Sequence, residues 1–552
     1  MKQAQCTLSG ETFQASDLEQ SLRQKFDLSD NPTTAPWVRF RELGAFWQHW
    51  NLHNRVCDLS GEKIISVFNE QCPYPIWHKD LWIKENNPPT ASYDFSRSFF
   101  EQAWELFQQC PLPHTFQSKN ENCDYTDDFY NSKNCYLCHS GQNNEDLMYS
   151  YGCDSAKDLC YSGRAFRSEL GVDIINSHHC FDSLYLLSCW NISNSAFLYD
   201  CRNCSDCLFC FNLRNKQYCF GNQQLTKTEF EAKKEQWDLS SRAVYDKAKY
   251  FFADMMIHKA WHKFQDIEHY ENASGSYISH VKNCENCHLL THHEDCVNVA
   301  FSGPKARLCL DSIGTVGAEL AYQCVLPVYS YFVRFCSAVN NCKFCDYSMF
   351  LQNCEHCFGC CGLFGKKYCI FNKQYSPTEY ETIRQKIIDQ MKKNNEWGKF
   401  FPGKFAPNSY EESWSSFYWP LSQTEQQKLG FRTLHKSPRN HENHLDITNI
   451  PDSVTNLTDE DEASLRQQSF WDKEYQRPFK ILGADIKFAR KMNCPLPNCF
   501  YMNRIQENFG WLFFNGKLTP SHCAKCQKSI QTNLPAKYHQ RILCEDCYLA
   551  IL

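Results

Sequence analysis

The sequence predicts a mainly β protein with additional α-helix, built from two duplicated cysteine-rich β-solenoid blocks with helical caps and a small C-terminal module. Three observations support this fold class. The 35 cysteines of the 552-residue chain are concentrated in two blocks and in a short C-terminal segment. The two blocks align with each other, and one short cysteine motif recurs inside both. A chain of this length holds material for several cores, so we expect several domains.

Residues 1–116 predict an α/β region with two turns that resemble metal-binding knuckles. The runs Cys6-Thr-Leu-Ser-Gly and Cys57-Asp-Leu-Ser-Gly each place a turn directly after a cysteine but lack a second cysteine. We interpret both as turns without metal, and keep open a further site made from Cys6, Cys57 and nearby histidines. Helical spacing of the aromatic residues predicts a core-facing helix at the end of this region; they are Phe99, Phe100, Trp104 and Phe107.

Residues 117–224 and 271–375 predict two cysteine-rich repeat blocks. The run 203–231 aligns without a gap to the run 353–381, at a constant offset of 150 residues. At this offset four cysteines of the first run meet four of the second: Cys204, Cys207, Cys210 and Cys219 against Cys354, Cys357, Cys360 and Cys369. Such a correspondence indicates an internal duplication.

A shorter element, Asn-Cys-x-x-Cys, recurs inside the blocks, at 134–138, 203–207, 283–287, 341–345 and 353–357. Recurrence of this kind, with short apolar runs between polar turns, predicts the coils of a β-solenoid. We expect small inward residues to stack from coil to coil and asparagine side chains to form ladders at the corners. Cysteine separations of 12 and 15 residues are about equally common, so the sequence leaves the coil length open.

A helix is predicted directly after each block. Thr226-x-x-Glu229 and Ser376-x-x-Glu379 are capping boxes, in which the hydroxyl and the carboxylate satisfy the first free backbone N–H groups of a helix. A solenoid exposes its last coil unless something covers it, so we expect these helices to cap the two blocks.

The remaining segments complete the predicted domain organisation. Residues 225–270 are a helical cap or connector, and residues 376–434 are a helical cap followed by an ordered aromatic wrap. The polar run 435–468 predicts a linker. Residues 469–552 form the C-terminal module.

The C-terminal module contains the strongest chemical signal. Cys523-Ala-Lys-Cys526 is followed, after 17 residues, by Cys544-Glu-Asp-Cys547. Two such pairs at this separation can offer four thiolates to one tetrahedral Zn²⁺, so the segment predicts a zinc-ribbon or treble-clef-like module with a structural zinc ion. Four thiolates leave no open position for water, which disfavours a catalytic zinc. An iron site or a redox dithiol pair is the alternative.

The other cysteines are open to more than one interpretation. Cys494 and Cys499 lie just upstream of the zinc signal and are candidates for further metal binding, but no second pair of ligands lies near them in the sequence. The cysteines of the repeat blocks could pack as small apolar side chains, bind additional metal or do redox chemistry, and the solenoid prediction favours packing. The chain lacks the common dinucleotide, phosphate-loop, serine-hydrolase and zinc-protease motifs, so we assign no catalytic residue.

Charge and apolar patterning bear on partners and location. The formal charge of -6 gives no global case for nucleic-acid binding. Residues 479–552 carry ten Lys or Arg against four Asp or Glu, and a basic module of this kind can contact phosphates. The N-terminus has no signal-peptide pattern, and no run approaches a transmembrane length. We therefore expect a cytoplasmic protein without membrane contact.

Several motifs in a fixed order carry a resemblance to a known family. They are the run CDLSGEKIIS, the segment YDFSRSFFEQAWEL, the repeats ending in LRNKQYC and KKYCIFNKQYS, the stretch ending in FYWPLSQTEQQKLG and the final CEDCY. Together they resemble an uncharacterised cysteine-repeat, zinc-ribbon family of candidate-phyla-radiation bacteria, over nearly the whole chain. The sequence departs from the family around Ala35-Pro36-Trp37, where relatives often carry a CPxC or CPxxR-like signature, and this departure argues against metal binding in the N-terminal region. The resemblance implies no mechanism; a coenzyme A transferase label on some relatives finds no support in these residues.

Three functional hypotheses follow. The first is a non-enzymatic, zinc-containing binding or scaffold protein whose solenoid surface recognises a protein partner. The second is an enzyme that uses thiol or metal chemistry. The third is a nucleic-acid-binding protein that acts through residues 479–552. The sequence does not determine the oligomeric state.

Overall fold

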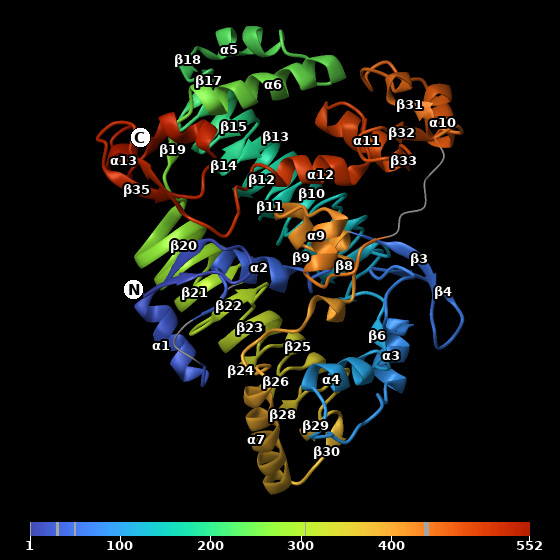
Figure 1. Ribbon diagram of the computed structural model, residues 1–552. Helices are drawn as coiled ribbons and strands as arrows, with labels where there is room; N and C mark the ends of the chain where they lie inside the picture. Colours follow the sequence, from blue (N-terminus) through green and yellow to red (C-terminus); the bar gives the residue numbers. More distant parts are fainter. Residues whose placement is uncertain (1, 29–31, 49–50, 304, 435–440) are drawn as a thin grey trace.

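The computed structural model describes residues 2–28, 32–48, 51–303, 305–434 and 441–552. The protein is mainly β, and most of its strands belong to two stacks of parallel strands that meet at an angle (Figure 1). Helices and shorter hairpins cover the outer faces and the ends of the stacks. Among the described residues, no helix combines the length and the apolar character needed to cross a membrane.

Stack 1 extends from residue 117 to residue 224, and its strands pair in parallel until a final antiparallel hairpin. Its strands are β7 (Gln117–Ser118), β8 (Thr126–Tyr130), β9 (Cys138–Gln142), β10 (Lys157–Cys160), β11 (Gly163–Phe166), β12 (Glu169–His178), β13 (Phe181–Leu187), β14 (Trp190–Ser193), β15 (Ala196–Tyr199), β16 (Arg202–Phe211), β17 (Gln217–Phe220) and β18 (Gln223–Gln224).

Stack 2 extends from residue 267 to residue 374 and ends in the same kind of antiparallel hairpin. Its strands are β20 (Ile267–Thr291), β21 (Glu294–Ala300), β22 (Leu310–Ile313), β23 (Glu319–Val328), β24 (Tyr331–Arg334), β25 (Ser337–Asn340), β26 (Lys343–Asp346), β27 (Met349–Gln352), β28 (Glu355–Phe358), β29 (Lys367–Ile370) and β30 (Lys373–Gln374).

The register of the parallel ladders determines the coil length. Lys157 pairs with Glu169 in stack 1, and Tyr331 pairs with Lys343 in stack 2. Both pairs are 12 residues apart, and the same separation recurs through the two stacks. One coil of stack 2 is a residue longer, because Val297 pairs with a residue 13 positions away. The protein is thus a β-solenoid with 12-residue coils, which settles the choice that the sequence left open.

Left-handed backbone at every third residue makes the corners of each coil. Asn191, Asn194 and Phe197 are successive corners, with φ angles of 54°, 49° and 56°. Four corners fit into a 12-residue coil, so each coil has four sides of three residues. Apart from glycine, asparagine and aspartate adopt this conformation most readily. The Nδ2 of Asn191 donates to the Oδ1 of Asn203 in the next coil at 2.9 Å, so the predicted asparagine ladder is confirmed.

The residue after each corner belongs to the interior of its stack, and the interiors form two separate hydrophobic cores. The core of stack 1 includes eleven cysteines, and the core of stack 2 includes twelve. These cysteines are Cys123, Cys135, Cys138, Cys153, Cys180, Cys189, Cys201, Cys204, Cys207, Cys210 and Cys219 in stack 1, and Cys284, Cys287, Cys296, Cys309, Cys324, Cys336, Cys342, Cys345, Cys354, Cys357, Cys360 and Cys369 in stack 2. All of them are buried free thiols.

Backbone hydrogen bonding explains why the interior positions favour small polarisable or hydroxyl side chains. The backbone N–H of Cys207 donates to Ser195 Oγ in the preceding coil at 3.0 Å. Sulfur takes the same role where the N–H of Cys135 donates to Cys123 Sγ at 3.4 Å. Buried N–H groups need partners, and serine and cysteine are small side chains that can accept such a bond inside a narrow coil.

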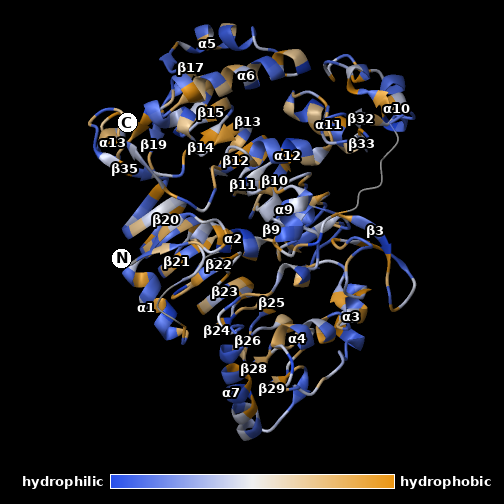
Figure 2. Ribbon diagram, viewed as in Figure 1, coloured by the Kyte–Doolittle hydropathy of each residue, from blue (hydrophilic) through white to orange (hydrophobic). Residues whose placement is uncertain are grey.

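Each stack ends under a helix, as the capping boxes predict. The α5 helix (Lys227–Lys234) begins after Thr226 and α7 (Pro377–Lys393) begins after Ser376, and both capping boxes are formed. The long helix α6 (Arg242–His258) follows α5 and packs over β15 of stack 1. Figure 2 shows hydrophobic residues along the strands of both stacks, whereas hydrophilic residues predominate on the outer helices α9 (Gln423–Lys428) and α10 (Asp459–Gln467).

The N-terminal region and the aromatic wrap pack against the outside of the stacks in one large core. The aromatic helix predicted there is α4 (Phe99–Phe107), whose Phe99 and Phe107 are fully buried. In the wrap, which also contains α8 (Ser415–Tyr418), Trp414 is fully buried and its ring stacks with that of Trp47 at 6.2 Å.

The other elements of the N-terminal region are short. They are β1 (Lys2–Gln5), β2 (Thr12–Ala15), α1 (Asp17–Lys25), α2 (Pro36–Gly44), β3 (His53–Val56), β4 (Lys63–Ser66), β5 (Ile76–Trp77), α3 (Lys79–Glu85) and β6 (Leu112–Pro113).

The segment predicted to be a linker contains secondary structure. Residues 435–440 lie outside the described residues, but β31 (Leu445–Asp446) pairs with β32 (Phe470–Asp472), and α10 contacts the next helix. The hydroxyl of Thr458 caps α10 and Leu465 on its inner face is buried, so the helix has both a start signal and an apolar contact. The sequence did not predict this helix, because the segment as a whole is polar.

The C-terminal region continues with β33 (Arg477–Phe479), α11 (Gly483–Met492) and α12 (Tyr501–Phe509). A buried aspartate of stack 1, Asp173, anchors α12: Arg504 Nη2 lies 2.5 Å from Asp173 Oδ2, and Asn508 Nδ2 donates to its Oδ1 at 2.7 Å. Burial raises the pKa of the Asp173 carboxyl, but the Arg504 guanidinium outweighs this effect and holds the pKa below its ordinary value.

Candidate metal centre

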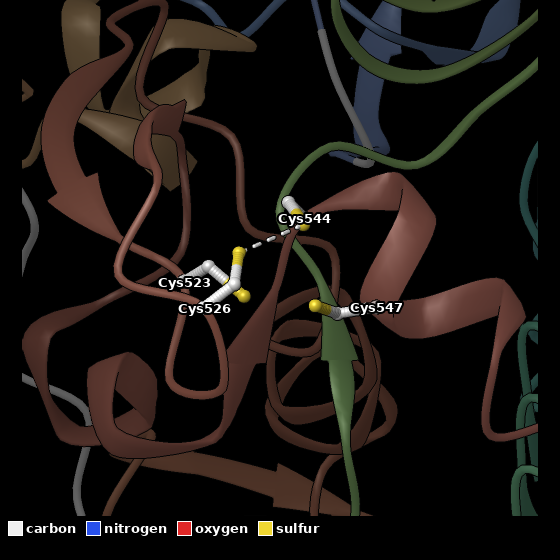
Figure 3. Close-up of side chains that lie close together, drawn as sticks. All are labelled: Cys523, Cys526, Cys544 and Cys547. Atoms are coloured by element: carbon white, nitrogen blue, oxygen red, sulfur yellow. Dashed lines mark hydrogen bonds between the residues drawn. The ribbon is translucent and has the colours of Figure 1, made fainter.

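The four cysteines of the C-terminal signal come together at one point of the structure. Cys523 and Cys526 lie in the turn between β34 (Thr519–His522) and β35 (Ser529–Thr532), and Cys544 is the N-cap residue of α13 (Glu545–Leu549). Cys547 lies in the first turn of the same helix. The four sulfur atoms all lie within 4.8 Å of one another. Figure 3 shows the two cysteines of the turn facing the two cysteines of the helix.

A network of backbone hydrogen bonds shapes this turn. The N–H of Cys523 donates to the carbonyl of Lys528, and the N–H of Gln527 donates back to the carbonyl of Cys523, both at 2.9 Å. Gln527 has a left-handed backbone, with a φ of 60°. The N–H of Ala524 donates to the carbonyl of Ile542 at 2.8 Å, and this bond holds the turn against the strand that leads into α13.

The sulfur environment favours charge on at least one thiol. Burial raises the pKa of Cys523, but the backbone N–H groups of Cys526, Cys544 and Lys525 outweigh it and lower the pKa to about 6. The neighbouring thiols of Cys526 and Cys544 raise the pKa of Cys547 to about 12. Four sulfurs this close cannot all ionise without a cation between them, because like charges repel.

A cation that prefers four sulfur ligands would resolve this repulsion. Four thiolates in a tetrahedral arrangement are typical of zinc and of iron–sulfur sites, and all four positions would then belong to the protein. Cys526 Sγ and Cys544 Sγ are 3.6 Å apart, as expected for two ligands that face one centre. The cluster could hold a metal ion, and it offers no free position for a substrate.

The unit that carries the cluster lies where the two stacks meet. Its strand β36 (Ile542–Leu543) pairs in parallel with β19 (His262–Lys263), the strand that enters stack 2. Tyr548 of α13 donates a hydrogen bond to Asp200 at the last coils of stack 1, and Arg214 Nη2 pairs with the same aspartate at 3.0 Å. Asp200 and Tyr548 are 348 residues apart, and no local sequence signal predicts their contact.

The upstream pair Cys494 and Cys499 does not join the cluster. Cys494 is buried in the large core next to the end of α11, and burial raises its pKa to about 12. Burial also raises the pKa of Cys499 to about 11. Among the described residues, the metal-capable group of three or more ligands contains neither of these thiols.

Cys6 and Cys57 lie apart from each other, in different hairpins. Cys6 follows β1 and Cys57 follows β3, and each is buried. In the part of the chain that the structure describes, neither belongs to a group of three metal-capable ligands, and the same holds for the cysteines in the stack interiors. The interior thiols instead donate to backbone carbonyls; Cys189 Sγ, for example, lies 3.4 Å from the carbonyl oxygen of Leu187.

Much of the positive charge predicted for residues 479–552 is paired with carboxylates. Within the described part of the chain, five of these ten basic side chains have an ion-pair partner: Arg490 with Glu462, Lys491 with Asp158, Arg504 with Asp173, Lys517 with Glu11 and Lys528 with Asp546. Partners from stack 1 and from the N-terminus contribute to this pairing. A phosphate backbone would compete with these carboxylates.

Known proteins add no further constraint on this site. No protein-family model matches the chain, and a search of curated proteins finds no match.

Proposed function

We propose that the protein is a non-enzymatic, zinc-containing binding or scaffold protein built on a duplicated solenoid. The observation that carries this proposal is the cluster of four cysteine sulfurs within 4.8 Å at the junction of the two stacks. A metal ion there would fasten the hairpin of β34 and β35 to α13, and through Tyr548 and β36 would hold the ends of the two stacks together.

Zinc is the ion that we assign to the cluster. Two CxxC pairs with 17 residues between them have the ligand spacing of structural zinc sites of the ribbon or treble-clef type. A single four-cysteine site also fits zinc without any redox partner nearby. A small unit whose own core is limited gains much of its folding free energy from such an ion.

The proposal also includes the duplication of one solenoid block and the binding of a protein partner by the stacks. Both stacks end in an antiparallel hairpin followed by a capping-box helix, as expected if one ancestral block was duplicated. Stacked coils present long surfaces, and here they carry regular ladders of charge, such as Lys133 with Glu121 at 3.2 Å and Lys367 with Glu355 at 2.7 Å. Surfaces of this kind suit recognition of a protein partner.

The two alternatives receive less support. An enzyme that uses the repeat thiols would need accessible thiolates, whereas the interior thiols are buried. Burial raises the pKa of Cys153 to about 12, and although neighbouring thiols lower the pKa of others, such as Cys204 and Cys354, these sulfurs also lie inside the stacks. Nucleic-acid binding through residues 479–552 would have to displace the ion pairs of that region. A cytoplasmic location suits so many unpaired thiols, because a reducing compartment preserves them.

Elemental analysis tests the proposal directly. Purified wild-type protein should contain one zinc ion per chain, and the Cys523→Ala variant should contain none. Cys189→Ala, which removes a thiol from the interior of stack 1, is the matched control and should keep the zinc. Zinc-free wild-type protein, or equal zinc in all three samples, would reject the assignment.

Thiol titration of the native protein separates the scaffold from the thiol enzyme. We expect the interior cysteines to react only when the protein unfolds. Several fast-reacting interior thiols would instead favour the enzyme hypothesis.

A further inference from the structure

Three hairpins of the chain share one turn. The C-terminal turn after Cys523 has counterparts after Cys6 and Cys57, which share the run Leu-Ser-Gly-Glu with each other but only the cysteine with the C-terminal turn. In each, the cysteine N–H donates to the carbonyl five residues later: Cys6 to Glu11, Cys57 to Glu62 and Cys523 to Lys528, at 2.8, 2.8 and 2.9 Å. The residue four positions after the cysteine then donates back to the cysteine carbonyl at 2.9 Å in all three turns.

The backbone conformation of the three turns is also the same. The residue that donates back is left-handed in each case, with φ angles of 71° at Gly10, 75° at Gly61 and 60° at Gln527. The following strand pairs in antiparallel register with the first, beginning at the sixth residue after the cysteine. A turn of this kind is the half of a zinc site that supplies the first pair of ligands.

The second half of the site is equivalent as well. The residue after each cysteine donates its N–H to a distant carbonyl: Thr7 to Thr33 at 2.9 Å, Asp58 to Ile76 at 2.9 Å and Ala524 to Ile542 at 2.8 Å. The residue two positions after each of these carbonyls is the N-cap of a helix. The N-cap residues are Ala35 for α2, His78 for α3 and Cys544 for α13.

These equivalences identify the positions that would be ligands in the two N-terminal units. The second cysteine of the turn, Cys526, corresponds to Ser9 and Ser60. The N-cap cysteine, Cys544, corresponds to Ala35 and His78, and Cys547 corresponds to Val38 and Leu81. Each N-terminal unit therefore retains one of the four ligand positions as cysteine: Cys6 in the first and Cys57 in the second.

The retained sulfurs have the surroundings of metal ligands. The N–H of Ser9 donates to Cys6 Sγ at 3.4 Å, and the N–H of Ser60 donates to Cys57 Sγ at 3.5 Å. The N-cap N–H of His78 donates to Cys57 Sγ at 3.2 Å. In the C-terminal unit, the corresponding N–H groups of Cys526 and Cys544 point to Cys523.

Apolar packing occupies the centre of the first N-terminal unit. Cys6, Phe13, Ala35 and Val38 form a small buried cluster that is separate from the main core, and all four are at most 5 % exposed. Three of these residues occupy ligand positions. The helix α2 of this unit is also tied down without a metal, because Arg39 pairs with Asp311 of stack 2 at 2.8 Å between two buried side chains.

We propose that residues 2–28 with 32–44, and residues 53–85, are two further copies of the C-terminal metal unit, in which side-chain packing has replaced the metal. Each copy keeps the backbone framework of a tetrahedral site for a thiolate-seeking divalent cation such as Zn²⁺. Each also lies against a solenoid: α2 contacts β22 and β23, while Lys79 Nζ at the start of α3 donates to the carbonyl of Gln117 in the first coil of stack 1. The same unit of a hairpin and a helix thus supports the stacks at three places, once with a metal ion and twice without.

Restoring the missing ligands tests the proposal. The full-length variant Ser9→Cys/Ala35→Cys/Val38→Cys should bind one zinc ion more per chain than the wild type. Ser60→Cys/His78→Cys/Leu81→Cys should gain one zinc ion in the second unit. Cobalt loading should give each variant additional visible absorption of tetrahedral Co²⁺–thiolate type, in proportion to the added site.

A matched control removes the retained ligand. Cys6→Ala added to the first triple variant leaves three new cysteines but only three ligands, and should cancel the gain in tightly bound zinc. Circular dichroism and the unfolding midpoint show whether each variant folds. If either folded triple variant gains no zinc ion over the wild type, the framework of that unit is not a copy of the metal site.

The outcome can be read independently of the C-terminal zinc. Because the measured quantity is the difference from wild type, zinc-free wild-type protein would reject the proposed function and leave this comparison intact. One zinc ion in the wild type without a gain in the triple variants would reject the copies and leave the proposed function standing.

Discussion

Cysteine has two different roles in this protein, and they are clearest when the interior of a stack is compared with the C-terminal cluster. In the stacks, the single S–H of Cys189 has two backbone carbonyls within reach as acceptors, those of Leu187 at 3.4 Å and of Leu198 in the next coil at 3.6 Å. At the cluster, backbone N–H groups instead point to the sulfur of Cys523. A thiol that donates as Cys189 does is neutral, whereas the cluster suits a thiolate.

The comparison also explains which residues can replace cysteine. At interior positions serine alternates with cysteine, since Ser177 and Cys189 follow each other in one column of stack 1 and the N–H of Cys189 donates to Ser177 Oγ at 3.0 Å. Small size and weak polarity are what the narrow coil requires. At the cluster, serine would keep the size but would not supply a thiolate for a zinc ion.

Replacing cysteine by serine should have its largest effect at the C-terminal cluster, and the same replacement in a stack interior provides the comparison. Cys544→Ser should remove the zinc ion, because one of four thiolates is lost, and residues 519–549 should lose their protection from hydrogen exchange. Structural zinc contributes about 10–16 kcal/mol of apparent binding free energy in small zinc peptides, so this unit should not fold without it. Hydrogen exchange with mass spectrometry and elemental analysis measure both effects. Retained zinc or unchanged protection would contradict the assignment.

A smaller effect is expected when an interior acceptor is removed. Ser195 Oγ accepts the N–H of Cys207 at 3.0 Å and donates to the carbonyl of Ser193 at 2.7 Å. Ser195→Ala leaves a buried N–H without a partner and should lower the free energy of unfolding by about 1–3 kcal/mol in a urea titration. Ser195→Cys is the control and should restore part of this loss. An unchanged unfolding midpoint in the alanine variant would mean that water or another group satisfies the N–H.

The substitution Cys189→Ser should have the smallest effect on stability. Serine can make the same bonds to the carbonyls of Leu187 and Leu198, and it occupies equivalent positions in neighbouring coils. We expect a change of at most about 1 kcal/mol in the free energy of unfolding and no change in zinc content. A loss several times larger would show that the sulfur at this position does more than pack and donate a weak hydrogen bond.

Local spacing made some of these features predictable from the sequence. The two CxxC pairs place their four ligands through a turn and a helix start, and the recurring Asn-Cys-x-x-Cys element follows the coil corners. The coil length was not predictable from cysteines alone, because serine, alanine and leucine fill the other inward positions, as at Ser177 and Leu198. Inward positions recur at every third residue, and both 12 and 15 are multiples of three, so the ladder register is what establishes the 12-residue coil.

Other features depend on contacts between distant parts of the chain. The bond between Tyr548 and Asp200 joins residues 348 positions apart. The two N-terminal copies of the metal unit were visible only as single cysteines, because the residues that replaced their ligands, such as Val38 and Leu81, look like ordinary core residues in the sequence. The equivalence emerges from backbone hydrogen bonds, which no spacing rule for ligands can detect.

The cluster and stack 1 should lose their structure at different pH values, because acid protonates thiolates in the first and a carboxylate in the second. At the cluster, protons compete with the metal for thiolate sulfur, so zinc release should begin while the pH is still above the range of ordinary carboxyl titration. In stack 1, Arg504 holds the pKa of Asp173 below its ordinary value. A carboxyl with a depressed pKa stabilises the folded state fully above its unfolded pKa of about 3.9, and the stabilisation is lost as the pH falls through the folded pKa.

We therefore expect zinc release, followed with a chromophoric zinc indicator, to precede the loss of β-sheet circular dichroism as the pH falls. Asp173→Asn should remove the part of the acid sensitivity of the stack that comes from this ion pair, and should leave the pH of zinc release unchanged. It should also lower the stability at neutral pH, because Arg504 would be left buried without its partner. If zinc release and loss of sheet structure coincide in the wild type and in Asp173→Asn, the cluster and stack 1 unfold as one unit. The two roles of cysteine would then not give the cluster and the stack separate stabilities.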